Sequence, residues 1–244
     1  MSSLILAAVA FLLLHLLVSG TTIRDQLVAR LGEGRYLGLF SLASVAVLAW
    51  MFVAHRLARG EAADLAWWGV TPVTRSLQFG LMLLAFLLIV PGVLTRNPGA
   101  VGQAAAVDDP DPVRGVLRIT RHPFLWGTAI WSAGHILVKG DLASLVLFGS
   151  LLVLSLGGAA SIDAKRRRTH GERWAAFEAR SSFVPFAAIL SGRQVLKPSE
   201  FALQALIAVG VYLVVLLAHP FIAGVSALPL TDPVEPVPTY RNRT

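Results

Sequence analysis

Six long apolar stretches dominate this sequence and limit the folds that it can adopt. A helix needs roughly 20 apolar residues to cross about 30 Å of hydrocarbon, and each stretch is that long or nearly so. With 55% hydrophobic and only 14% charged residues among 244, the composition argues against a water-soluble domain. The sequence predicts an all-α integral membrane protein, a six-helix bundle with spans at 4–19, 36–54, 77–94, 123–138, 142–160 and 201–221.

The basic residues predict how this bundle is oriented. A formal net charge of +7 would raise nucleic-acid binding for a soluble protein, but in membrane proteins Lys and Arg collect in cytoplasmic loops. Alternate loops carry 15 and six of the 21 Lys and Arg residues. We therefore expect a lipid bilayer and no nucleic acid as partner, with the richer side in the cytoplasm and both termini outside. This assignment of loops to the two sides holds only if the short fourth stretch crosses the membrane and does not form a re-entrant loop.

The polar segments differ in character. Segment 97–118 is rich in Pro, Gly and Asp and predicts an ordered or semi-ordered loop. In segment 163–183, Trp174 and Phe177 lie near helical spacing among basic residues, which favours an interfacial helix on anionic lipid over a solvated one. Gly140 and Asp141 predict a turn with a helix cap. One transmembrane domain is expected at 1–227, followed by a Pro-rich C-terminal tail at 228–244.

The chain has no cysteine, which excludes disulfides, thiolate-ligated metals and cysteine nucleophiles. Any metal must be held mainly by His or carboxylates. Five of the six histidines lie in or at the ends of apolar stretches, where ionisable side chains are costly: His15, His55, His122, His135 and His219. Each alone is either a hydrogen-bonded neutral imidazole or a functional group. Together they predict that at least two bind iron, because neutral imidazole is a usual axial ligand of haem.

Helix geometry limits which histidines can cooperate. His122 and His135 are 13 residues apart, which puts them roughly 20 Å apart on opposite faces of one helix. By depth, His15 and His122 lie near the cytoplasmic face, whereas His55, His135 and His219 lie near the outer face. The candidate pairs are therefore His15 with His122, or His135 with His219 or His55.

Two further groups are candidate cofactor contacts. Trp131 lies one turn before His135, and Gly127 and Gly134 leave room for a flat macrocycle or a polyene, or for close packing of another helix. Arg121 and His122 precede Pro123, which can start a helix, and are held at the cytoplasmic interface. Together they can hold a haem propionate, a phosphate or the carboxylate of a nucleoside cofactor. The alternative is that Arg121 reaches lipid phosphate.

Two blocks carry a family resemblance: RITRHPFLWGTAIWSAGHILVKGDLASLVLFGS at 118–150 and SIDAKRRRTHGERWAAFEARSSFVPFAAILSGR at 161–193. They resemble the NnrU family of bacterial membrane proteins, and LLLHLLVSG, RLGEGRYLGLFSLAS and AHPFIAGVSALP fit it too. This resemblance covers most of the chain outside 97–112 and the last dozen residues. It implies the bacterial inner membrane, where the charge count would put both termini in the periplasm. It also implies a role in nitrogen-oxide metabolism, supporting nitrite and nitric oxide reductases in denitrification.

The NnrU family is also homologous to the 15-cis-zeta-carotene isomerases, membrane enzymes with haem b that isomerise one double bond of a cis polyene. That similarity implies haem b here, with His15 and His135 as iron ligands and His122 and His219 as replacements. An isomerase predicts an apolar tunnel beside Trp126, Trp131 and His135. An accessory protein of a nitrogen-oxide reductase system predicts an exposed partner surface without such a tunnel.

A third resemblance is to membrane methyltransferases of the isoprenylcysteine and phospholipid type, which bind S-adenosylmethionine. It rests on RHP, the glycines within 127–140, and GERWxxFxxR followed by Pro185. The sequence departs from that pattern at Leu125, where an aromatic residue is expected. It departs again at Asp163, which stands where an acidic pair is expected.

Overall fold

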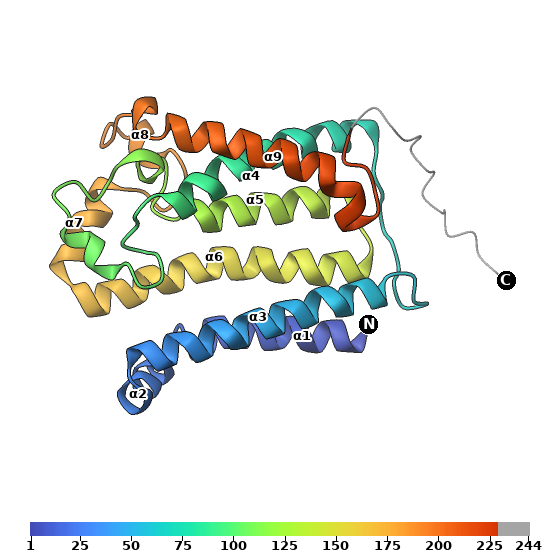
Figure 1. The fold of residues 1–244 in the computed structure, drawn as a ribbon, viewed down its shortest axis with the longest axis horizontal. Coiled ribbons are helices and arrows are strands. Elements are labelled where there is room, and N and C mark those ends of the chain that lie inside the picture. Colours follow the sequence, from blue (N-terminus) through green and yellow to red (C-terminus); the bar gives the residue numbers. More distant parts are fainter. Residues whose placement is uncertain (229–244) are drawn as a thin grey trace.

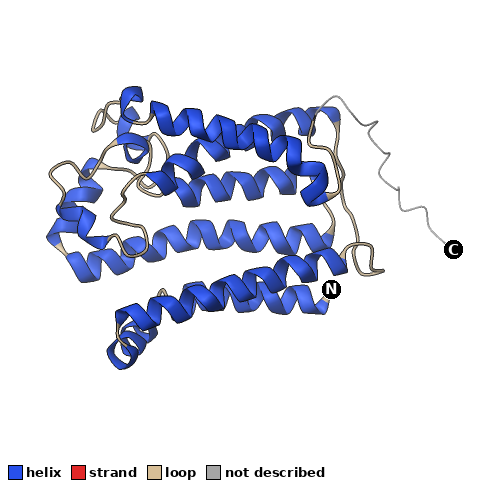
Figure 2. Ribbon diagram, viewed as in Figure 1, coloured by secondary structure: helices blue, strands red, loops and turns tan. Residues whose placement is uncertain are grey.

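The computed structural model describes residues 1–228, and the Pro-rich tail from residue 229 lies outside the described residues. Within this range the chain is helical, as predicted, and the β-pairing is confined to one isolated bridge between Ala66 and Asp141. The helices that match the six apolar stretches run along one long axis (Figures 1 and 2). They are α1 (Ser2–Leu12), α3 (Glu33–Ala58), α4 (Pro72–Leu94), α5 (Pro123–Val138), α6 (Leu142–His170) and α9 (Ala202–Ala223).

Short elements complete the two ends of the bundle. One end, here called the α7 end, carries the following elements: α2 (Thr22–Leu31), α7 (Glu172–Arg180), α8 (Ala187–Leu190) and the 3-10 turns Ala104–Asp108, Gly115–Arg118 and Pro198–Glu200. The opposite end, here called the Lys139 end, holds the N-terminus, the turn between α5 and α6 and the last turn of α9 (Figure 1).

The expected count of six spans is confirmed only in part. Among the described residues, α3, α4, α6 and α9 are long and apolar enough to cross a membrane. Helix α5 has 16 residues, about 24 Å of helix, which is short of the hydrocarbon thickness. The first stretch continues from α1 into a π-helix at Leu13–Val18 and then bends by 79° into α2, so it counts as a fifth span only if the bent pair is one.

Local sequence explains several helix starts. Thr71 and Thr74 form a capping box at α4, and Asp141 accepts a hydrogen bond from the Ser144 amide at 2.8 Å to cap α6, as predicted. Glycine is required at position 140 because the Trp68 ring packs directly against it, and a Cβ there would lie 2.5 Å from that ring. The flexibility of its backbone is not the reason. This contact fastens the loop after α3 to the turn between α5 and α6.

The two glycines of α5 serve helix packing rather than a cofactor. A Cβ at Gly127 would lie 2.8 Å from the Ala85 carbonyl oxygen, and one at Gly134 would lie 2.5 Å from the Met82 methyl group. Helix α4 therefore occupies the space that the sequence left open for a macrocycle or polyene. Small residues at a helix interface allow such close backbone approach.

Helix α7 does not lie with its apolar residues against lipid. Trp174 and Phe177 are completely buried, in one cluster with Val107 and Val113 from the 97–118 loop. The expectation of an interfacial helix was wrong because the two aromatic rings face this loop and form its core. The same contacts explain why the 97–118 loop is ordered.

Candidate functional site

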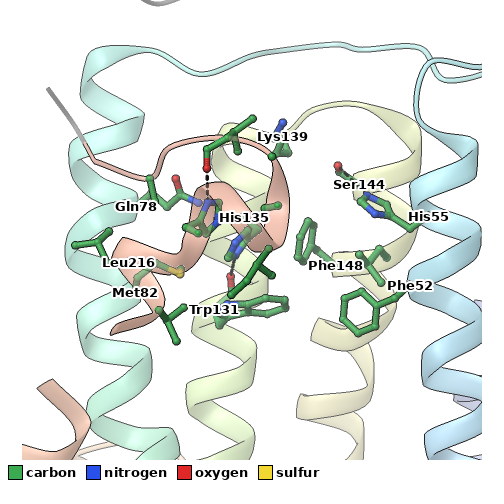
Figure 3. Close-up of a pocket in the computed structure, with 18 of the residues that line it drawn as sticks. Phe52, His55, Gln78, Met82, Trp131, His135, Lys139, Ser144, Phe148 and Leu216 are labelled. Atoms are coloured by element: carbon green, nitrogen blue, oxygen red, sulfur yellow. Dashed lines mark hydrogen bonds between the residues drawn. The ribbon is translucent and has the colours of Figure 1, made fainter. Parts of the chain in front are cut away.

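A cavity of about 480 Å³ opens at the Lys139 end between α3, α4, α5, α6 and α9. Its volume is within the range of roughly 300–1,000 Å³ typical of small-molecule sites. The walls are mainly aromatic and aliphatic, with Phe52, Phe79, Met82, Phe86, Trp131, Leu147, Phe148 and Leu216 among them. The cavity also brings together three of the predicted histidines, His55, His135 and His219. Figure 3 shows this pocket.

His135 projects from α5 with a defined tautomer. Its Nδ1 lies 2.8 Å from the carbonyl oxygen of Trp131. A carbonyl oxygen only accepts, so Nδ1 carries the proton and Nε2 keeps its lone pair. The ring is fixed by stacking on Phe148 at 4.6 Å and by contact with Trp131 at 4.4 Å. Figure 3 shows these rings together.

His219 reaches the same cavity from the last turn of α9. Its Nδ1 lies 2.7 Å from the Val225 carbonyl oxygen, so Nε2 is again the free nitrogen. His135 and His219 are close enough to interact electrostatically. His55 lies on the other side of Phe148, with Nε2 3.5 Å from the Ser144 hydroxyl (Figure 3). The structure thus groups the three histidines that the sequence placed near the outer face.

His15 is not among the residues that line this cavity. It lies in the π-helix, with Nδ1 2.9 Å from the Phe11 carbonyl oxygen and its ring between Phe11 and Phe40. Its neighbour Leu16 packs beside Gly157 of α6, whereas His135 packs beside Phe148 of the same helix. Nine residues of helix correspond to roughly 13 Å, so the structure does not bring His15 and His135 to one site.

Arg121 and His122 meet at the α7 end, where both are paired with Asp163 of α6. The Arg121 guanidinium donates to both carboxylate oxygens at 2.5–3.1 Å, and His122 Nε2 lies 2.8 Å from Oδ1. All three side chains are buried. Glu178 of α7 adds a second carboxylate, 3.2 Å from Arg121. The anion held by this constellation is therefore the chain's own, and it joins the start of α5 to α6 and α7.

A second cluster of charged and polar side chains, around Arg118, was not predicted from the sequence. Arg118 donates to Glu200 at 2.8 Å and to the Gln194 side chain at 2.6 Å. The hydrogen bonds from Arg118 lower the pKa of Glu200 to about 2, helped by the Gly115 amide. These residues are far apart in the chain, so the sequence pointed to the cluster only through Arg118, the first residue of RITRHP.

Two curated relatives match about half of this chain, and one family model matches most of it. It is 35% identical to the chloroplastic 15-cis-zeta-carotene isomerase of Arabidopsis thaliana over 136 residues, which are 51% of this chain and 36% of that protein. The Zea mays isomerase is 32% identical over 136 residues, covering 54% and 35%. The match therefore spans about a third of the length of these relatives. No solved structure was found to match. The model of the NnrU protein family matches residues 3–227, and the chain belongs to the NnrU family.

Proposed function

We propose that this protein binds haem b in the cavity at the Lys139 end, where His135 and His219 would hold the iron. One observation carries the proposal: two imidazoles, each bound through Nδ1 to a carbonyl oxygen, present their Nε2 atoms at a single cavity with mainly apolar walls. Axial histidines commonly donate their other ring N–H to a carbonyl group, which fixes the ring and strengthens it as a ligand. Both residues have that second partner.

The donor set suits haem better than a bare metal ion. Within residues 1–228, no three His, Asp or Glu side chains come together as a metal-binding group. A porphyrin fills the remaining positions around iron and needs only one or two protein ligands. The aromatic walls would exclude water, and Trp131 and Phe148 would hold His135 in place. Haem, when bound, would supply an iron that exchanges between the ferrous and ferric states.

Family membership supports a physiological setting for this site. We propose that the protein acts in the bacterial inner membrane, in support of the nitrogen-oxide metabolism associated with NnrU proteins. In that setting it would serve a nitrite or nitric oxide reductase system as an accessory haem protein. Deletion of the gene should then lower nitric oxide reductase activity in membranes, and restoration by the wild-type but not the His135→Ala protein would test whether the cavity is needed.

Isomerisation of an apolar cis polyene is the second candidate. It is favoured by the likeness to two zeta-carotene isomerases and by the aromatic cavity walls beside His135 and Trp131. Trp126 does not line the cavity, since its indole N–H donates to the Phe183 carbonyl oxygen at 2.8 Å. Incubation of the reduced protein with 15-cis-zeta-carotene separates the candidates, because an accessory protein leaves the isomer ratio unchanged.

The S-adenosylmethionine alternative receives no similar support. Arg121 and His122 are paired with Asp163 and Glu178, and neither residue lines the cavity. Binding of S-adenosylmethionine measured by calorimetry would reverse this assessment.

A reduced-minus-oxidised absorption spectrum tests the haem proposal. The purified wild-type protein, supplied with haem, should show a Soret band and the sharp visible bands of a six-coordinate low-spin haem. His135→Ala and His219→Ala should each lose the low-spin spectrum, whereas His15→Ala and His122→Ala should keep it. Lack of a Soret band after haem supplementation would overturn haem binding. If His15→Ala lost the low-spin spectrum and His219→Ala kept it, the result would instead support His15 and His135 as ligands.

A further inference from the structure

Three cationic side chains line the same cavity as the histidines: Arg56, Arg59 and Lys139. Arg56 lies in the last turn of α3, Arg59 ends that helix, and Lys139 ends α5. The two arginines are exposed and Lys139 is half-buried, so their positions form a rim at the Lys139 end. Arg59 and Lys139 are both close enough to His55 to interact with it electrostatically, and so are the carboxylates of Asp64 and Asp141. The cavity is therefore apolar inside and positively charged at its edge.

The acidic residues around this rim are engaged elsewhere. Glu61 pairs with the N-terminal amine of Met1. Asp64 accepts hydrogen bonds from the backbone amides of Gly60 and Ala143, and Asp141 caps α6. Among the described carboxylates, none lies within the 4.0 Å ion-pair distance of a rim cation. The rim cations therefore have no direct ion pair within the described part of the chain, and the nearby Asp64 and Asp141 carboxylates offset only part of their charge.

Helix dipoles account for only part of this arrangement. Cations are favoured at helix C-termini, and both α3 and α5 end at the rim. However, α4 and α6 begin at the same end, and their N-termini carry the opposite partial charge. The dipoles also give no reason for three side chains from two helices to line one cavity.

We propose that Arg56, Arg59 and Lys139 form a carboxylate subsite that takes the propionates of haem b. The inference rests on the proposed function. Haem is a flat apolar body with two carboxylates along one edge, which matches an apolar cavity with cations along its rim. Charge-assisted hydrogen bonds to Arg are short and strong, and two arginines and a lysine are enough for two carboxylates. This subsite would hold the two carboxylates at the rim, and the apolar part of haem would contact the aromatic walls.

The test compares haem with its dimethyl ester, in which both propionates are uncharged. Each ligand is titrated into the purified protein and followed by the Soret band. The wild-type protein should bind haem on the order of tenfold or more tightly than the ester, as expected for charged hydrogen bonds. The preference for haem should shrink as salt is raised, because these rim charges are exposed.

Variants locate the effect. Arg56→Gln, Arg59→Gln and Lys139→Gln combined should bind haem and the ester alike, with the affinity for the ester unchanged. The charge-retaining combination Arg56→Lys with Arg59→Lys should keep most of the preference. Arg30→Gln, an exposed arginine at the α7 end with no described ion pair, is the matched control and should behave as wild type.

Each failure has a separate meaning. Equal wild-type affinity for haem and ester, with a low-spin spectrum, overturns the subsite and leaves haem binding standing. Loss of ester binding in the triple glutamine variant shows that the cations support the cavity itself, and also overturns the subsite. If the wild-type protein binds neither ligand, the proposed function fails and the subsite falls with it.

Discussion

Asp163 is the residue on which most buried charge converges. Its carboxylate accepts from the Arg121 guanidinium and from His122, and all three groups are shielded from solvent. A buried ion pair adds little net stability relative to an apolar substitute, but removing one partner leaves the other charge buried and unpaired. Removing one member of the cluster should therefore cost more stability than the intact ion pairs contribute.

Asp163→Asn should destabilise the protein by about 3–5 kcal/mol, because Arg121 would keep its charge in a buried place without its main partner. Thermal unfolding in detergent, followed by circular dichroism, measures the change. Asp108→Asn is the matched control, because the Asp108–Arg173 pair is exposed and such pairs contribute at most about 1 kcal/mol. Equal melting temperatures for the two variants would contradict the assignment.

Glu200 should make the stability depend on acid pH. Its folded-state pKa is lowered to about 2 from an ordinary value of 4.5, so its ionised form is favoured in the folded protein. The stabilisation is complete above the ordinary pKa and is lost as pH falls from about 4.5 toward 2. In unfolding scans across this window, Glu200→Gln should show a smaller decline than wild type. A parallel decline in both proteins would show that Glu200 is not responsible.

At the scale of elements, α5 is the helix that positions the site. It lies between α4 and α6, carries Trp131 and His135 to the cavity, and starts beside the Asp163 cluster. Its contact with α4 is close because Gly127 lacks a side chain where it faces the backbone of Ala85 and Ile89. The position of the cavity histidine therefore depends on the fit between these two helices.

Gly127→Ala should destabilise the protein by about 1–3 kcal/mol, since the added methyl group meets backbone atoms that cannot move aside. Gly134→Ala should cost clearly less, because it meets the terminal methyl group of Met82, which is flexible. Melting temperatures of the two single variants give the comparison. A greater loss for Gly134→Ala would show that the α4–α5 contact is described wrongly.

Sequence patterns predicted the helices better than they predicted the contacts between them. Helix α5 was predicted at its observed bounds because Pro123 favours a helix start and the Lys-Gly-Asp turn follows it. The π-helix was not predicted, since the apolar pattern of 4–19 is continuous. The bend follows at Ser19-Gly20-Thr21, where that stretch was predicted to end. The positions of Trp174 and Phe177 were predicted wrongly, and the role of Gly127 stayed open between helix packing and a cofactor, because each depends on which segment packs against it. The histidine depths followed from residue counting, but the choice among pairs needed the fold.

At the scale of the whole molecule, the helices form two groups around the cavity. Helices α4, α5 and α9 pack together on one side, and α1 and α3 pack together on the other, with α6 in contact with both groups. The α7 end carries the basic segment 165–197, and the Lys139 end carries the cavity and its rim. The charge count predicts that the α7 end faces the cytoplasm, so the cavity would open toward the periplasm.

Single cysteines can test this orientation without background, because the chain contains none. Ala62 and Ala175 are exposed residues at the Lys139 end and the α7 end. A membrane-impermeant maleimide, applied to cells with a permeabilised outer membrane, should label Ala62→Cys at once and Ala175→Cys only after lysis. The reverse pattern would invert the topology, and labelling of both in intact cells would show that the helices do not separate the two ends.

The position of α9 has a consequence for how the cavity comes into being. Helix α9 is the last described helix in chain order, and it supplies His219 together with much of one cavity wall. A ribosome releases this segment only after the other helices have emerged, so the cavity cannot be closed while the chain is still short. The complete cavity can therefore take its ligand only late in biosynthesis, either through the opening at the Lys139 end or from the bilayer between the two groups of helices.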